Sequence, residues 1–188
     1  PRLCPASTYA PVVLATGKSF TYPVALCEFL ALDPVVIAEN GGVAYVEPTE
    51  TVHHVGDRAA AQAVADAYVE AGHNLGWGAV DFVNRWRETE VAVSRESPRE
   101  PLERLVHEHG LDVVDTGYAY HVKSPDVTKG ETLELVAEEV GLATTDFVAV
   151  GDSENDVSTF EVVDESYAVS NADETARAAA DVVTDGSY

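Results

Sequence analysis

The sequence predicts an α/β protein whose doubly wound, Rossmann-like parallel sheet is interrupted by an inserted α+β domain. Short apolar runs alternate with helical patterns in residues 1–56 and 123–188, as in parallel sheets that helices cover on both faces. The segment 57–122 differs, because it joins an Ala-rich helical pattern to a Gly-, Trp- and Arg-rich stretch. The 188 residues suffice for one main core and one small accessory domain.

The first half of the predicted core is marked by apolar runs and turn residues. A helix is expected at 20–32, and strands at 11–15, 35–38, 43–46 and 51–55, the last two as a hairpin. Ser19 is the expected N-cap of that helix, because Pro23 is tolerated only in a first turn. Residues 39–42 (ENGG) are expected to turn the chain between the second and third strands.

The remaining elements divide between the insert and the second half of the core. In the insert, helices are expected at 57–71 and 99–109, and strands at 90–94, 111–115 and 118–123. After Thr128 a helix is expected to about 140, then a strand at 147–150 and a loop and helix to 160. Two weaker strands, 167–169 and 182–183, flank a helix rich in Ala and Arg.

The composition is strongly acidic, with 33 Asp and Glu against 11 Lys and Arg and a net charge of −22. Such a surface repels nucleic acid and anionic membranes, and it fits a halophilic protein in which salt screens the self-repulsion; an ordinary acidic protein is the alternative. No apolar run reaches the length of a membrane span and no signal peptide opens the sequence, so we expect a cytoplasmic protein. Cys4 and Cys27 form no CxxC motif, which disfavours disulfides and zinc.

The most informative motif is GDSEND, residues 151–156, which follows the apolar run FVAV. A buried strand would deliver Asp152 to the carboxyl end of the sheet, where open α/β folds bind ligands. Asp156 lies four residues later, so both carboxylates can converge on one hard cation, and an incomplete oxygen shell suits Mg²⁺. Ser153 and Asn155 are expected to hydrogen-bond these carboxylates. The alternative is an acidic turn that caps a helix.

Two further elements indicate phosphate binding. Lys129 precedes a helix and lies 23 residues before Asp152, and a helix N-terminus attracts anions. Thr16 and Gly17 end the first apolar run, where a hydroxyl and free N–H groups can hold a phosphoryl oxygen. Alone, Lys129 would be interpreted as a solvated surface residue and Thr16-Gly17 as an ordinary turn.

Together these motifs resemble three of the four motifs of the haloacid dehalogenase (HAD) superfamily: Thr16 the second, Lys129 the third, and Asp152 with Asp156 the fourth. The stretches VVIAENGG (35–42), VNRWRE (83–88) and GYAYHVK (117–123) resemble archaeal phosphoglycolate phosphatases more narrowly. The resemblance implies a HAD-like core at 1–56 and 123–188 with a cap domain at 57–122. It also implies Mg²⁺-dependent hydrolysis of 2-phosphoglycolate through an aspartyl-phosphate intermediate, with Thr16 and Lys129 catalytic and Thr16, Gly17 and Lys129 binding substrate.

The sequence departs from this family at the first motif. The resemblance calls for a DxD strand before Thr16, and no Asp or Glu precedes Glu28, so no nucleophile is assigned. We expect a truncated sequence, also lacking the family's last stretch, rather than a degenerate protein, because Lys129, Asp152 and Asp156 remain. The polypeptide as written is therefore expected to hydrolyse nothing.

Substrate choice is expected to come from the cap. Arg85 and Arg87 are candidates to bind a substrate carboxylate through a bidentate fork, and cation–π packing with Trp86 is the alternative. The rival functions are a related sugar-phosphate or phosphoglycerate-type phosphatase, and a non-catalytic protein that binds a metal and an anion. The expected partner is a small phosphorylated substrate, not nucleic acid or membrane, and a homodimer is one form the protein could take.

Overall fold

The computed structural model describes residues 11–185, which form two compact units, one ending at Val127 and one beginning at Thr128. Cys4 lies outside the described residues. Each unit is described by itself. Among the described residues no helix is long and apolar enough to span a membrane.

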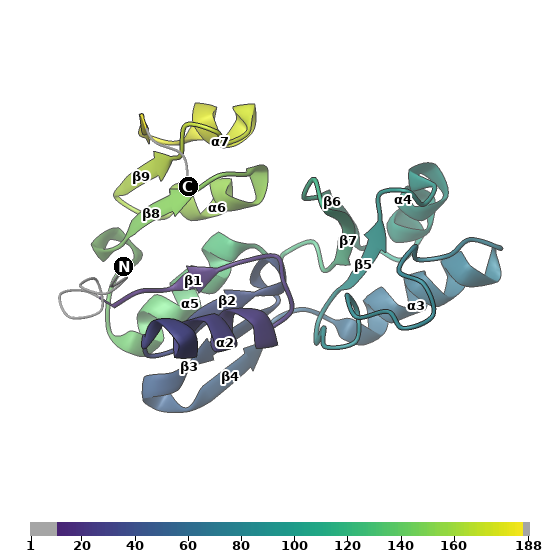
Figure 1. The fold of residues 1–188 in the computed structure, drawn as a ribbon, viewed down its shortest axis with the longest axis horizontal. Coiled ribbons are helices and arrows are strands. Elements are labelled where there is room, and N and C mark those ends of the chain that lie inside the picture. The colour runs from purple at the N-terminus through teal and green to yellow at the C-terminus, as the bar shows by residue number, and fades with distance from the viewer. Residues whose placement is uncertain (1–10, 186–188) are drawn as a thin grey trace. The chain divides into compact units, whose positions relative to one another are not determined.

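The first unit contains a four-stranded sheet in the order β1-β2-β3-β4 (Figure 1). β1 pairs with β2 in parallel, and the other neighbours are antiparallel. The strands are β1 (Leu14–Ala15), β2 (Val35–Ala38), β3 (Val43–Val46) and β4 (Thr51–His54), and helix α2 (Thr21–Leu30) lies between β1 and β2 in sequence. Short 3-10 helices, Glu39–Gly41 and Glu47–Thr49, join the later strands. The predicted hairpin of β3 and β4 is confirmed.

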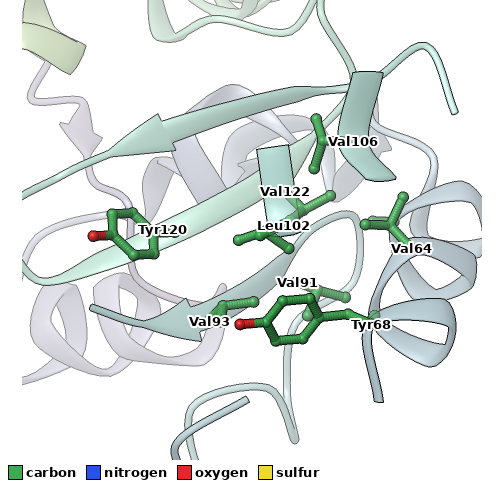
Figure 2. Close-up of a cluster of buried hydrophobic side chains, with 10 residues drawn as sticks. Val64, Tyr68, Val91, Val93, Leu102, Val106, Tyr120 and Val122 are labelled. Atoms are coloured by element: carbon green, nitrogen blue, oxygen red, sulfur yellow. The ribbon is translucent and has the colours of Figure 1, made fainter. Parts of the chain in front are cut away.

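The same unit contains a second sheet, in the order β5-β7-β6, which is antiparallel throughout. Its elements are α3 (Arg58–Glu70), β5 (Val91–Ser94), α4 (Arg99–Glu108), β6 (Asp112–Asp115) and β7 (Ala119–Lys123). Both helices contribute to a buried cluster with this sheet, and Figure 2 shows Tyr68 and Leu102 beside its valines. The segment therefore has a hydrophobic core of its own; its assignment as a cap domain stays a prediction.

The second unit has a parallel sheet in the order β10-β9-β8. Its strands are β8 (Val148–Gly151), β9 (Glu165–Ala168) and β10 (Val182–Val183), and its helices are α5 (Lys129–Val140), a 3-10 turn Thr144–Asp146, α6 (Val157–Phe160) and α7 (Glu174–Ala179). Thr128 caps α5, because its side chain accepts the N–H of Glu131. Phe160, Ala168 and Ala176 are the centre of its apolar cluster.

Three local expectations were wrong. Ser19 does not cap α2, because the helix begins at Thr21 after Phe20 and has no side-chain cap. The first strand has only two residues, Leu14 and Ala15, instead of the expected five. β8 is not fully buried, because Val148 and Val150 are 58% and 68% exposed.

The exposed strands share one property. β1 and β8 each lie at an edge of their own sheet, so each presents unpaired backbone groups on one side. Beside β1 an apolar groove of about 860 Å³ runs along α2 and is lined by Leu14, Tyr22, Leu26 and Phe29 among others. Phe29 is 88% exposed.

Candidate active site

The loop after β8 is organised by the carboxylate of Asp156, which is buried. Its Oδ2 atom accepts the backbone N–H groups of Asp152 at 3.0 Å and Ser153 at 3.2 Å. Its Oδ1 atom lies 2.6 Å from Nζ of Lys129. Both oxygens of Asp156 are thus engaged within the protein, and the carboxylate holds the loop in a tight turn.

Lys129 lies at the first position of α5 and is only 4% exposed. Besides Asp156, its ammonium donates to Oδ1 of Asn155 at 3.1 Å, and the Ser153 hydroxyl donates to the same oxygen at 2.7 Å. Sequence reasoning named these residues, and the structure brings Lys129, Ser153, Asn155 and Asp156 into one hydrogen-bonded group. Lys129 is therefore held at a fixed point beside the loop.

Gly151 permits the close approach of Asp156. A Cβ atom at residue 151 would lie 2.7 Å from Oδ2 of Asp156, closer than carbon and oxygen tolerate. Any larger residue would displace the carboxylate from the two N–H groups that it accepts. The glycine of the GDSEND motif thus has a steric role.

The donor set of this loop fits a hard cation. Asp152 is exposed. Oδ1 of Asp156 accepts one hydrogen bond, from Lys129, so this oxygen keeps a lone pair for a cation. Among residues 11–185 no group of three or more His, Cys, Asp or Glu side chains is gathered for a metal. A pair of carboxylates of this kind suits Mg²⁺, which keeps several waters and shares its shell with phosphate oxygens.

The second predicted phosphate element, Thr16-Gly17, lies in the first unit, directly after β1. The Thr16 hydroxyl accepts the N–H of Lys18 at 3.2 Å. The three loop carbonyls all accept hydrogen bonds: the N–H of Asn40 donates to Thr16, Arg87 to Gly17, and the N–H of Glu39 to Lys18. The Gly17 N–H has no hydrogen-bond partner among the described residues and is available to an anion.

A cluster of buried charged residues contacts this loop through Arg87. Glu90 is fully buried and pairs with both Arg87 and His121, whose Nδ1 atom is 2.7 Å from the Glu90 carboxylate. Asn40 donates to the other oxygen of Glu90 at 3.0 Å. Burial alone would raise the pKa of Glu90, but the charge and hydrogen bond of His121, together with Arg87, hold that pKa below its usual value. Arg87 thereby links the cluster to the Gly17 carbonyl.

Glu39 forms the second part of the cluster. Its carboxylate accepts the N–H groups of Glu88 and Thr89 and the Thr89 hydroxyl at 2.8 to 3.0 Å. Burial raises its pKa, although these hydrogen bonds act in the opposite direction. Glu39 and Asn40 both have positive φ, 54° and 56°, a conformation that costs non-glycine residues about 1–2 kcal/mol each. The surrounding hydrogen bonds hold this strained turn.

The two predicted cap arginines differ in environment. Arg87 is buried and used inside the protein, since it pairs with Glu90 and also donates to the carbonyls of Val83 and Gly17. Arg85 is exposed, and its guanidinium lies 5.4 Å from the centre of the Trp86 ring. The cation–π packing interpretation therefore describes Arg85 as it stands, and its contact with substrate stays a prediction.

Sequence reasoning missed the buried acids Glu39 and Glu90. Glu39 was interpreted only as part of a turn, and Glu90 as the start of a strand. A signal was present: each stands next to an apolar strand, VVIA or VAVS, where an acid is buried only if it is paired.

Comparisons with known proteins agree with the family that the sequence motifs indicated. A family model for haloacid dehalogenase-like hydrolases matches residues 91–187. Proteins named phosphoglycolate phosphatase are 59% identical in Natronomonas pharaonis, over 94% of this chain and 78% of the relative, and 36% identical in Archaeoglobus fulgidus, over 93% and 76%. The class of protein is a hydrolase with an α/β fold, whose candidate site lies in the loop between β8 and the following helix. The chain belongs to the haloacid dehalogenase-like hydrolases and is similar, within them, to the archaeal phosphoglycolate phosphatases.

Solved structures support the fold. The crystal structure of Thermoplasma acidophilum 0175 has a TM-score of 0.80 at 21% identity and covers 95% of this chain and 78% of its own. TM0651 from Thermotoga maritima has a TM-score of 0.72 at 20% identity, covering 95% and 80%. The predicted HAD-like α/β fold is confirmed. Relatives from halophilic archaea, among them Halobacterium salinarum at 57% identity over 92% of this chain and 76% of its own length, agree with the acidic, salt-adapted composition.

Proposed function

We propose that the complete gene product hydrolyses 2-phosphoglycolate to glycolate and phosphate with Mg²⁺ as cofactor. The observation that carries the proposal is the Lys129–Asp156 ion pair at the end of β8, 2.6 Å long and supported by two backbone N–H groups. The choice of 2-phosphoglycolate as the substrate rests on the relatives named phosphoglycolate phosphatase.

Lys129 is proposed to bind a phosphate oxygen. Its ammonium is charged and rigidly held, so little side-chain entropy is lost when an anion binds. A phosphate dianion repels an attacking carboxylate, and fixed positive groups reduce that repulsion most where charge develops. Asp156 orients Lys129 and is not itself expected to attack phosphorus.

The Thr16 hydroxyl and the Gly17 N–H are proposed to bind phosphate as well. The carbonyls of the loop already accept hydrogen bonds from Asn40, Arg87 and Glu39, so the loop offers its free N–H and hydroxyl groups to an anion. The resemblance to the family's motifs assigns Thr16 and Gly17 to the same reaction as Lys129.

Asp152 and Asp156 are proposed to hold Mg²⁺, which would neutralise phosphate oxygens. The covalent step implied by the family resemblance forms an aspartyl phosphate as the bond to glycolate breaks, and water then releases phosphate. The attacking aspartate is not assigned to any residue of this chain.

A substrate panel tests the proposal. The complete gene product, in high salt with Mg²⁺, is given 2-phosphoglycolate, 3-phosphoglycerate and glucose 6-phosphate, and released phosphate is measured. We expect the highest kcat/KM for 2-phosphoglycolate and loss of turnover with EDTA. Preference for the hexose phosphate would contradict the substrate, and absence of turnover on all three would favour a protein that only binds a metal and an anion.

The polypeptide of residues 1–188 provides the matched comparison. It contains Thr16, Lys129, Asp152 and Asp156 but no acidic residue before Glu28. We expect no Mg²⁺-dependent turnover by pure residues 1–188. Detectable turnover would show that one of the acidic residues already present is the nucleophile.

A further inference from the structure

Lys18 is a basic side chain that the proposed mechanism leaves without a role. It lies two residues after Thr16, is exposed, and lines the groove beside β1 together with Thr16 and Trp86. No carboxylate of the described residues forms an ion pair with its ammonium. In a chain with a net charge of −22, an ammonium without an acidic partner is a position suited to an anionic ligand.

Other basic groups of the first unit are engaged by the protein itself. Arg87 pairs with Glu90, Arg58 donates to the Glu90 carbonyl at 2.9 Å, and Lys123 donates to the carbonyls of Ser124 and Val127. These side chains hold the fold together and are buried or partly buried. Lys18 differs from these three because its ammonium faces an aromatic ring and solvent. The Arg85 guanidinium is also exposed beside an aromatic ring, but only Lys18 lies in the same loop as Thr16 and Gly17.

The inserted segment holds the Lys18 ammonium in place. Nζ of Lys18 lies 5.2 Å from the centre of the Tyr118 ring, within the range of a cation–π contact. Trp77 stacks on Tyr118 with ring centres 5.7 Å apart, and its Nε1 donates to the Ala92 carbonyl at 2.8 Å. Tyr118 itself lies in a turn closed by the N–H of Thr116, which donates to the Ala119 carbonyl at 3.1 Å.

This contact leaves hydrogen-bonding capacity on the ammonium. An aromatic ring attracts a cation but accepts no strong hydrogen bond, so the three N–H groups of Lys18 remain available to oxygen. The flexible four-carbon stem lets the ammonium reach a group on the same molecule whose phosphate is bound at Thr16. A ligand suited to this loop therefore carries a second anionic group near its phosphate ester.

We propose that Lys18 binds the carboxylate of the substrate and thereby selects short phosphorylated carboxylic acids over neutral phosphate esters. The proposal rests on the proposed phosphatase function. Tyr118 acts as a positioning residue for the ammonium, because it contacts Lys18 and not the substrate. Lys18, which lies in the same loop as Thr16 and Gly17, takes in this proposal the role that the sequence suggested for Arg85 and Arg87.

The test compares two substrates of equal length in the complete gene product: 2-phosphoglycolate and 2-hydroxyethyl phosphate, which lacks the carboxylate. For Lys18→Gln we expect KM for 2-phosphoglycolate to rise about 10- to 100-fold, as for one lost charge-assisted hydrogen bond, with kcat little changed. The kcat/KM for 2-hydroxyethyl phosphate should stay within about threefold. Lys18→Arg should retain most of the discrimination, and Tyr118→Leu should lose part of it.

Arg104→Gln is the matched control, because it removes one positive charge from the exposed face of α4. It should leave the ratio of the two substrates unchanged. If Lys18→Gln weakens both substrates equally, or neither, the carboxylate assignment is overturned while the phosphatase function stands. If the unmodified protein hydrolyses neither substrate, the proposed function fails first and the assignment fails with it.

Discussion

Two loops that follow parallel strands use their charged residues in the same way, although they belong to different units. In the second unit Lys129 and the buried Asp156 fix the loop, and Asp152 is exposed. In the first unit Arg87, Glu90 and Glu39 fix the loop from behind, and Thr16 and Lys18 face the groove.

The two loops differ in the number of charged side chains that hold them in place. The loop after β8 is held by one ion pair and backbone N–H groups from its own turn. The loop after β1 is held by the Arg87 guanidinium and by the backbone N–H groups of Glu39 and Asn40. Arg87 is in turn paired with the buried Glu90, which His121 on β7 also contacts. Such a network is costly when incomplete, because each buried charge then lacks its partner. Breaking the Arg87–Glu90–His121 network should therefore mainly lower stability, whereas removing the Lys129 ammonium beside the loop after β8 should mainly lower activity.

The largest expected effect is on stability, at Glu90. In Glu90→Gln the buried Arg87 and His121 lose a carboxylate partner, and we expect a loss of about 3–5 kcal/mol in the free energy of unfolding. Chemical denaturation measures it. Glu88→Gln is the control, since its exposed contact with His54 at 3.3 Å should be worth at most about 1 kcal/mol. Equal losses in the two variants would contradict a structural role for the cluster.

The largest expected effect on activity is at Lys129. Lys129→Met removes the ammonium that lies 2.6 Å from Asp156, and kcat of the complete gene product should fall about 100- to 1,000-fold, as for loss of one donor to a developing charge. Steady-state phosphate release measures it. Lys129→Arg keeps the charge and should recover part of the rate. A Met variant with unchanged kcat would remove Lys129 from the mechanism.

A smaller effect is expected at Gly17. A Cβ atom there would lie 2.7 Å from Oδ1 of Asn40, so Gly17→Ala should displace Asn40 and cost about 1–3 kcal/mol of stability. The same substitution made in an Asn40→Ala background should cost much less, because the clash is gone. Thermal unfolding of the unmodified protein, the two single variants and the double variant measures the coupling between residues 17 and 40. If the losses of stability simply add, a Cβ atom at residue 17 does not clash with Asn40.

The smallest effect is a pH dependence at Glu39. Burial raises the pKa of this carboxyl above its model-compound value of 4.5, so the folded state binds the proton more tightly than the unfolded state. Its contribution to stability is complete below pH 4.5 and is lost as pH rises through the folded pKa. Relative to Glu39→Gln, the unmodified protein should therefore lose stability between acidic and neutral pH. A constant difference across that range would contradict the raised pKa.

Most elements of the fold were predictable because their apolar periodicity and caps are local. Thr128 before α5 and Asp57 before α3 are such caps, and both side chains accept an N–H in the first turn. The GDSEND loop was predictable for the same reason, since its residues are neighbours in sequence. The structure adds the direction of Asp156, whose oxygens turn back to the loop and Lys129.

The buried charge cluster and the Lys18 contact were not predictable, because both join residues far apart in sequence. Arg87 meets Gly17 across 70 positions, and Lys18 meets Tyr118 across the inserted segment. Single-sequence patterns report local periodicity and not such pairings. The predicted length of β1 was also wrong, because an apolar run does not show which of its residues pair with a neighbouring strand.

The most direct test of the division of roles between the two proposed Mg²⁺ ligands compares Asp152→Asn with Asp156→Asn. Asp156 is buried and also holds the loop and Lys129, whereas Asp152 is exposed. Unfolding free energies are measured without Mg²⁺, and the shift in Tm on adding Mg²⁺ is measured separately. We expect Asp156→Asn to lose about 3–5 kcal/mol without metal, because Lys129 loses its buried partner, whereas Asp152→Asn keeps its stability and loses the Mg²⁺ shift. Equal destabilisation of the two variants without metal, or a full Mg²⁺ shift in Asp152→Asn, would contradict that division.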